Sequence, residues 1–277
     1  MIKFEHMEVM GWEHAIRGMR NPKRSHIKSD SDWEVSFSEE ESSYADNNPI
    51  EKTDILEDFV VGPNDHDLMM RLSKAGSDHR KYMRMVDVYV DITAPLYWWK
   101  EFDTYRVGVE KNSDSTMHMI HAKEFTLDDF SHEHLIEYKD IQNDLRKGPG
   151  IDHVCCVWDE EGCGVNCPDD ILDFVIKMLN KARMLYNQAC EKLKRTDLTE
   201  SERQHVQAQK KAFWWQMIQL LPSSYNQKRT VKMSYEALAN MYKARKNHKL
   251  DEWRTFCSWI EELPCSEIIL GGYLDEE

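Results

Sequence analysis

The residues best suited to chemistry lie between Asp91 and His118, where aromatic rings and ionisable groups share a short stretch of chain. The stretch combines these aromatic and charged residues: Trp98, Trp99, Phe102, Tyr105, Lys100, Glu101, Asp103 and Arg106. Such a mixture suits a pocket for a flat, anionic, aromatic ligand, because aromatic rings stack on the ligand's ring and a guanidinium group can form two hydrogen bonds with a phosphate. An amphipathic helix whose tryptophan side chains pack inward is the alternative, and composition favours it.

Local patterns predict the elements that carry this stretch. Apolar residues from Val86 to Ile92 alternate with polar ones, as in a strand, and Pro95 is well placed to begin a helix. The stretch therefore follows a strand and lies on a helix and its exit. Further strands are expected at Val107 to Lys111 and at His118 to Leu127.

The C-terminal part of the sequence is strongly helical. Apolar residues keep a helical period from Ile171 to Leu193, and Thr199 with Glu202 forms a capping box that opens a second helix ending at Pro222. Together they predict a long helical hairpin. Other helices are expected from Asn64 to Gly76, capped by Asn64 or Asp65, from Met233 to Lys246, and around Trp253.

Composition excludes some classes of partner. The chain has 277 residues and a formal net charge of −14, which argues against a general binder of nucleic-acid polymers. A small phosphorylated ligand needs only two or three local cations and stays compatible with this charge. No run of about 18 apolar residues occurs, so no membrane partner is expected and we predict a soluble, cytoplasmic protein.

The sequence predicts a single domain over residues 1–277 with two irregular segments. The segment at about 23–48 is rich in Ser, Asp and Glu and predicts a mobile acidic loop. The segment at about 128–168 reads as an insertion that contains Cys155, Cys156, Cys163 and Cys167. These cysteines lack the paired spacing of a structural zinc site, so free thiols are favoured over zinc and no metal is predicted.

Two stretches resemble motifs of the flavin-dependent thymidylate synthases. That family follows a strand with a helix, an Arg-His-Arg motif, and then an Asn-Glu-x-Ser-x-Arg-Tyr run. Aligned from Ala94-Pro95, the segment Thr104-Tyr105-Arg106 falls on Arg-His-Arg and keeps its last Arg. With one inserted residue, Asn112 and Ser115 fall on the Asn and Ser of the run, while Ser113 replaces its Glu.

The second stretch begins at Leu221-Pro222, which matches a Leu-Pro of the family. The family's polar positions then fall on Ser234, Glu236, Asn240 and Arg245 without a gap, and two of these four match. The segment Gly76 to His79 resembles the family's glycine-histidine element before the strand. The resemblance covers about residues 56–127 and 174–263.

The resemblance implies a mixed α/β (α+β) fold with a large helical part, assembled as a homotetramer with shared active sites. It implies FAD as cofactor, NADPH and methylene-tetrahydrofolate as co-substrates, and conversion of dUMP or a related pyrimidine deoxynucleotide by one-carbon transfer to C5. Chemistry is carried by the flavin, so no catalytic side chain is implied. Substrate-binding residues would be Glu101, Tyr105, Arg106, Ser115 and Arg245. Cofactor-binding residues would be His79, Lys100, Asn112, Ser234 and Asn240.

Glu236 departs from the family most sharply. A carboxylate stands where the family has a cation, and a buried, unpaired carboxylate would repel an anionic cofactor. In that case Lys100, Lys232 or Arg229 would have to supply the missing charge. Two hypotheses therefore stay open: a flavin-dependent enzyme, or a non-catalytic descendant of the fold that binds a nucleotide or a protein. A third, unrelated alternative is a helical interaction protein that binds no small ligand.

Overall fold

A computed structural model describes residues 2–39, 53–135 and 168–271 of the chain. The elements, in chain order, are β1 (Lys3–Met10), α1 (Trp12–Arg20), the short 3-10 helices η1 (Asn21–Lys23) and η2 (His26–Lys28), β2 (Asp32–Glu39), β3 (Thr53–Val60), α2 (Pro63–Lys74), η3 (Arg80–Arg84), β4 (Asp87–Pro95), α3 (Leu96–Phe102), β5 (Val109–Ser113), α4 (Thr116–Met119), η4 (Leu127–Asp129), α6 (Pro168–Leu193), α7 (Glu200–Leu220), β6 (Asn226–Ser234), α8 (Tyr235–Arg245), α9 (Asp251–Glu261) and α10 (Glu267–Leu270). An α+β fold with a large helical part is thereby confirmed.

The chain divides into two compact units. The first unit holds residues 1–3, 92–104 and 112–229, and the second holds residues 4–91, 105–111 and 230–277. The main sheet has the strand order β1-β4-β6-β5, and each of its four strands contributes residues to both units. The prediction of a single domain stays a prediction.

Strand β4 follows the alternation seen in the sequence. Val88, Val90 and Ile92 are buried, whereas Tyr89 between them is exposed, so every second side chain faces a core. Pro95 was expected to begin the helix; it is the N-cap residue of α3, and Leu96 is the first helical residue. The expected strand-to-helix order is confirmed.

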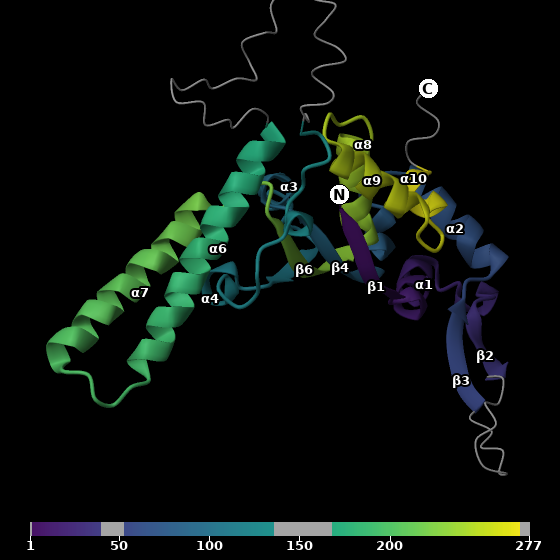
Figure 1. Ribbon diagram of the computed structural model, residues 1–277. Helices are drawn as coiled ribbons and strands as arrows, with labels where there is room; N and C mark the ends of the chain where they lie inside the picture. Colours follow the sequence, from purple (N-terminus) through teal and green to yellow (C-terminus); the bar gives the residue numbers. More distant parts are fainter. Residues whose placement is uncertain (1, 40–52, 136–167, 272–277) are drawn as a thin grey trace, which may run out of the picture. The chain divides into compact units, whose positions relative to one another are not determined.

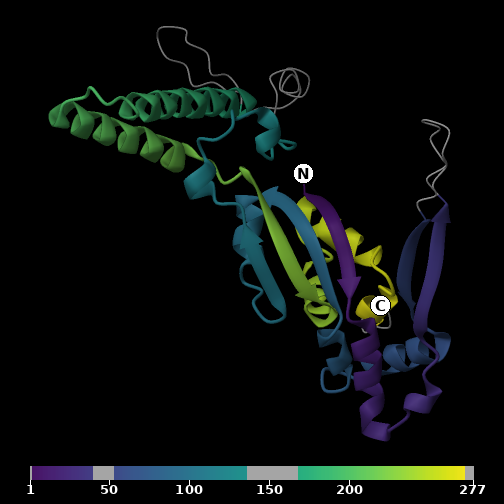
Figure 2. The same cartoon turned by 90° about the horizontal axis from the view of Figure 1, so that it is seen from below.

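In the first unit, α6 and α7 lie side by side as an antiparallel hairpin (Figure 1). Thr199 and Glu202 bond reciprocally as the predicted capping box of α7. Figure 2 shows the same pairing from below. The hairpin packs its inner face into an apolar core made of Ile120, Phe125, Phe130, Leu172, Ile176, Leu179, Ala182 and Met217.

The second unit contains the two-stranded sheet β2-β3, whose register pairs Asp32 with Val60 and Glu39 with Thr53 (Figure 2). The sequence predicted a mobile loop at about 23–48, but η2 and β2 occupy its first part through Glu39. The segment DWEVSFSE alternates polar with apolar residues, a pattern typical of a strand, although most of its residues are polar. Residues 40–48 of the predicted loop, and most of the Cys-containing segment, lie outside the described residues.

Asp65, near the start of α2, organises the base of this hairpin. Its fully buried carboxylate accepts from Arg20 Nε at 2.5 Å, and from the hydroxyl groups of Ser29 at 2.7 Å and Ser31 at 2.8 Å. Burial disfavours the charged form, but these hydrogen bonds outweigh burial and hold the pKa of Asp65 below its usual value. We call these residues the Asp65 network.

The cap of α2 differs from the prediction. Gly62, rather than Asn64 or Asp65, is the N-cap residue. Asp30 supplies the missing acceptor from another segment, since its carboxylate accepts from the backbone N–H groups of Asn64 at 2.9 Å and Asp65 at 3.1 Å. A carboxylate at a helix N-terminus satisfies donors that have no partner within the helix.

One predicted strand is absent, and one observed strand was not predicted. Residues 118–127 form no strand, because α4 ends there and an irregular segment delivers Ile120 and Phe125 to the core. Asn180 on α6 replaces a sheet partner by bonding both backbone groups of Phe125, at 2.9 and 2.8 Å. Conversely, β6 was not expected as a strand, because its sequence NQKRTVKMS is largely polar.

Candidate functional site: arginines held against carboxylate and aromatic partners

In the second unit, η3 and α8 bring two arginines against Glu236. Arg84 donates to both carboxylate oxygens of Glu236, and Arg80 Nε lies 3.5 Å from Glu236 Oε1. Arg80 Nη2 also donates to Asn240 Oδ1 at 3.1 Å. Glu236 and Asn240 are one turn apart on α8 and therefore present the same face to η3. We call Arg80, Arg84, Glu236 and Asn240 the Glu236 cluster.

This pairing removes the electrostatic objection raised by the sequence. Glu236 is buried, with 10% of its side chain exposed, but it is shared by two guanidinium groups. Hydrogen bonding to Glu236 and its charge raise the pKa of Arg84. Within the Glu236 cluster itself, two guanidinium groups face one carboxylate, which leaves one positive charge in excess.

A second arginine of this unit lies on aromatic rings. Arg245, at the end of α8, donates through Nε to the Tyr105 hydroxyl at 2.9 Å. Its guanidinium carbon lies 4.6 Å from the ring centre of Trp253, which is fully buried on α9. Ring contact and hydrogen bond together fix the guanidinium plane, which a lysine could not reproduce. We call Tyr105, Arg245 and Trp253 the Arg245 cluster.

The other predicted residues of the second unit differ in their surroundings. His79 is exposed in the turn before η3, one residue from Arg80, and Arg106 is exposed. Ser234 is buried and caps α8, accepting from the Ala237 N–H at 3.3 Å. Its hydroxyl lies 2.5 Å from where a Cβ on Gly108 would stand, and Gly108 has φ +72°, so this turn requires glycine.

In the first unit, the aromatic stretch turns out to be core. Trp98, Trp99 and Phe102 are at most 1% exposed and pack on one another, with ring centres about 5 Å apart. The proposed stacking surface for a ligand is therefore wrong for these three side chains, and the inward-packed helix is confirmed. The burial of large apolar side chains outweighs any gain from leaving them open to a ligand.

Four predicted residues lie in this first unit. Lys100 is exposed and Glu101 half-buried on α3, while Asn112 is exposed on β5. Ser115 is the N-cap residue of α4 and accepts from the His118 N–H at 3.3 Å.

Arg229 forms a further cation site in the first unit. Its guanidinium lies 4.2 Å from the ring centre of Trp99 and donates to Asp103 Oδ1 at 2.8 Å and to Gln227 Oε1 at 3.0 Å. Asp103, a member of the charged and aromatic stretch singled out in the sequence, is thereby paired with Arg229. The sequence named Arg229 only as a reserve source of positive charge.

Sequence reasoning also missed Arg80 and Arg84 as site residues. The signal was present, since the segment from His79 to Arg84 reads HRKYMR and concentrates basic residues directly before a strand. The family resemblance compares single motif positions and does not weigh local charge, so it did not identify these two arginines.

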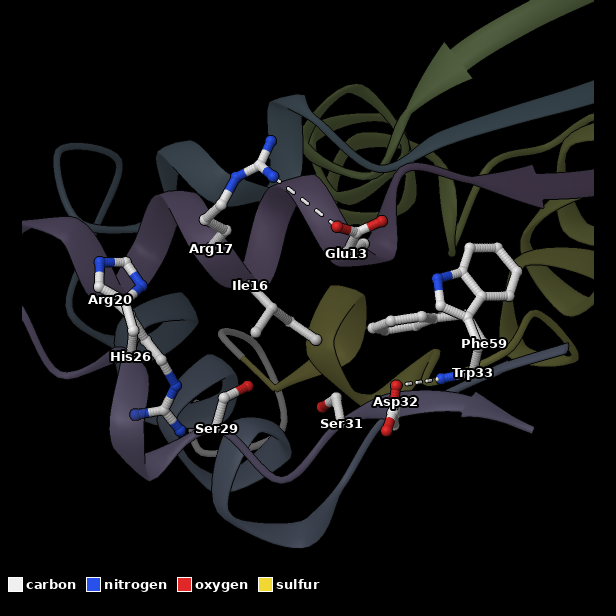
Figure 3. Close-up of a pocket in the computed structure, with 10 residues that line it drawn as sticks. All are labelled: Glu13, Ile16, Arg17, Arg20, His26, Ser29, Ser31, Asp32, Trp33 and Phe59. Carbon is white, nitrogen blue, oxygen red and sulfur yellow. Dashed lines mark hydrogen bonds and ion pairs between the residues drawn. The ribbon is translucent and has the colours of Figure 1, made fainter.

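A pocket of about 410 Å³ lies elsewhere in the second unit, between α1 and the β2-β3 hairpin (Figure 3). The figure shows Trp33 and Phe59 at one end and Arg20 and His26 at the other. None of the predicted site residues lines this pocket. Its serines and Arg20 belong to the Asp65 network, so its polar lining serves the fold.

Comparison with known proteins places the fold. No protein-family model and no curated protein matches the sequence. Among solved structures, the chain is similar to two of thymidylate synthase X from Helicobacter pylori, a flavin-dependent thymidylate synthase, each with FAD and dUMP. Identity is 12% and 14%, the TM-score is 0.50 for both, and the alignments cover 99% of this chain and 96% or 97% of theirs.

The described helices include none that is both long and apolar enough to cross a membrane. The similarity to the solved structures extends over nearly the whole chain, including the parts where the sequence motifs are eroded. The resemblance read from the sequence is confirmed at the level of the fold: this chain has the fold of the flavin-dependent thymidylate synthases.

Proposed function

We propose that this protein is a flavin-dependent enzyme that transfers a one-carbon unit to C5 of a pyrimidine deoxynucleotide, dUMP or a variant of it. The observation that carries the proposal is the Arg245 cluster. Tyr105 and Arg245 come from two separate motifs, 140 residues apart, and meet at 2.9 Å. The neighbours of known structure, which hold FAD and dUMP, support the same reading.

The Glu236 cluster fits the phosphates of FAD. Its two arginines outnumber its one carboxylate, and Arg84 is 56% exposed, so a diphosphate can approach the guanidinium from solvent. Arg80, Arg84 and Asn240 would hold the cofactor, with His79 beside them. Flavin, when bound, supplies the redox chemistry of such an enzyme. The residues of the chain bind and orient, which is how a protein accelerates cofactor-borne reactions.

Arg245 would hold the phosphate of the nucleotide, with Tyr105 fixing its orientation. Arg106, Glu101 and Ser115 are proposed as further substrate contacts, and Lys100, Asn112 and Ser234 as further cofactor contacts. As in the family, methylene-tetrahydrofolate would provide the carbon, and NADPH would provide, by way of the flavin, the two electrons that reduce it to a methyl group. The proposed assembly is a homotetramer with shared active sites.

The test begins with the visible absorption spectrum of the purified protein, followed by titration with FAD. We expect flavin bands, and we expect Arg84→Ala to weaken FAD binding at least about tenfold through loss of a charge-assisted hydrogen bond. Arg71→Ala is the matched control, since Arg71 pairs only at the surface, with Asp67. A colourless protein that takes up no added FAD would overturn the proposal.

Nucleotide binding is tested separately. Arg245→Ala should weaken dUMP binding at least about tenfold, while Arg254→Ala, an exposed arginine on the neighbouring α9, should not change it. Oxidation of NADPH that depends on dUMP then tests turnover. Equal dUMP affinity in Arg245→Ala and the wild type would exclude the proposed phosphate contact.

One observation favours the non-catalytic alternative. Glu236 already accepts from two guanidinium donors of Arg84 and lies at ion-pair distance from Arg80, as an internal anion would in a closed cofactor site. In that case the wild type would not bind FAD, whereas Glu236→Gln would bind it measurably. In the proposed enzyme both proteins bind FAD, so the same titration separates the two functions.

A further inference from the structure

Three possible metal ligands, none of them a member of the clusters described above, converge in the second unit. His66 lies on α2, whereas Glu267 begins α10 and Cys265 lies two residues before it, about 200 positions later in the chain. Their ligand atoms all lie within 4.8 Å of one another. His66 Nε2 and Glu267 Oε1 are already 2.5 Å apart.

This donor set has a definite chemical preference. A thiolate, an imidazole and a carboxylate together suit a borderline divalent transition ion far better than Mg²⁺ or Ca²⁺, which prefer oxygen ligands. We propose that His66, Cys265 and Glu267 form a binding site for Zn²⁺ or a chemically similar ion, with water as the fourth ligand.

The distances are compatible with such a site. Ligand bonds of about 2.0–2.3 Å in tetrahedral geometry separate the donor atoms by roughly 3.3–3.8 Å. The donor atoms of His66 and Glu267, now 2.5 Å apart, would have to separate for an ion to bind between them. Glu267 is 47% exposed and His66 32% exposed, so an ion and its water can enter from solvent.

The backbone holds the thiol in place. Cys265 has φ +52°, a left-handed conformation that is uncommon for a residue other than glycine. Two hydrogen bonds fix the turn around it: Tyr235 Oη donates to Pro264 O at 2.5 Å, and Ser266 Oγ donates to Glu261 O at 2.7 Å. An uncommon conformation kept by its surroundings is frequent at binding sites.

The alternative explanation is that no metal binds. The hydrogen bond between His66 and Glu267 would then only join α2 to α10, and the Cys265 thiol would have no role in it. Metal binding must release the proton of the Cys265 thiol to solvent, since the thiolate is the ligand. Thiolate coordination therefore distinguishes the two explanations.

The experiment is titration of the full chain with Co²⁺, followed by absorption, then competition by Zn²⁺. A thiolate ligand gives a charge-transfer band in the near ultraviolet, and tetrahedral Co²⁺ gives strong visible bands. We expect both in the wild type. Cys265→Ser should lose the charge-transfer band and bind at least about 100-fold more weakly, since even partners outside the ligand shell contribute 10–100-fold.

Controls address the other thiols. Cys190→Ser removes a half-buried thiol on α6 and should leave the bands unchanged. The fourfold variant with serine at 155, 156, 163 and 167 should also keep them. If the bands vanish in the fourfold variant, persist in Cys265→Ser, or are absent from the wild type, the site is not the one proposed.

A stability readout covers the case in which Cys265→Ser does not fold. An ion that binds only the folded state raises the melting temperature, by at least about 3 °C when the ion is in large excess over its dissociation constant. Zn²⁺ should raise the melting temperature of the wild type but not that of Glu267→Gln. Because the side chain of Glu267 is exposed, this variant is expected to fold. An equal shift in both proteins would contradict the proposal.

Discussion

Replacing Asp65 by Asn should destabilise the protein severely although the change is nearly isosteric. Asp65 is 0% and Arg20 4% exposed, so the substitution leaves a guanidinium buried without its anion. Its new amide N–H₂ group would also face the hydroxyl groups of Ser29 and Ser31, which now donate to the carboxylate. Removing one partner of a buried ion pair lowers the free energy of unfolding by about 3–5 kcal/mol.

Urea unfolding followed by tryptophan fluorescence measures this change. Asp67→Asn, two residues along the same helix, is the control: Asp67 and Arg71 are 68% and 67% exposed, so that change should lower the free energy of unfolding by less than about 0.5 kcal/mol. The double variant Arg20→Met/Asp65→Asn should recover part of the loss, because the unpaired charge is gone. Equal losses for Asp65→Asn and Asp67→Asn would refute the reasoning.

Further predictions concern pH and packing. The folded-state pKa of Asp65 lies below the unfolded value, so the stabilisation by its carboxylate is complete above about pH 4 and is lost as pH falls through the folded-state pKa. In urea unfolding, the difference in free energy of unfolding between wild type and Asp65→Asn should therefore be constant from about pH 7 to 5 and shrink below about pH 4. Leu179→Ala, in the fully buried hairpin core, should lower the free energy of unfolding by about 2–5 kcal/mol. Met184→Ala, with 42% exposure on the same helix, should change it by less than about 0.5 kcal/mol, and equal losses would contradict the assigned core. Thr199→Ala should remove the capping box and lower the free energy of unfolding by about 1 kcal/mol, which thermal unfolding would detect.

Features that depend on neighbouring residues were predictable from the sequence. The capping box of Thr199 and Glu202 and the alternation of β4 follow from residues at most a few positions apart. Strand β6 was missed because its polar side chains look exposed when read alone. In the structure Thr230 donates to Asp91 at 2.6 Å and Lys232 pairs with Asp87 at 2.9 Å, partners more than a hundred residues away.

The candidate site shows the same division. Tyr105 and Arg245 were found because a family resemblance pointed to both, although nothing local connects them. Arg80 and Arg84 were missed, and Trp98 and Trp99 were set in two competing roles, because aromatic residues beside charges suit both a helix core and a ligand pocket. Only burial decides between these roles, and burial depends on the whole chain.

The order of strands in the main sheet has a consequence for synthesis on the ribosome. Strand β4 ends at Pro95, but β6, which lies beside it, begins only at Asn226. At about 5–20 residues per second, one edge of β4 waits on the order of ten seconds for its partner. During that interval β1 can pair with the other edge, but the open edge and its valines are a template for association between nascent chains. The late strand thus defines the period in which this edge of β4 stays open to association.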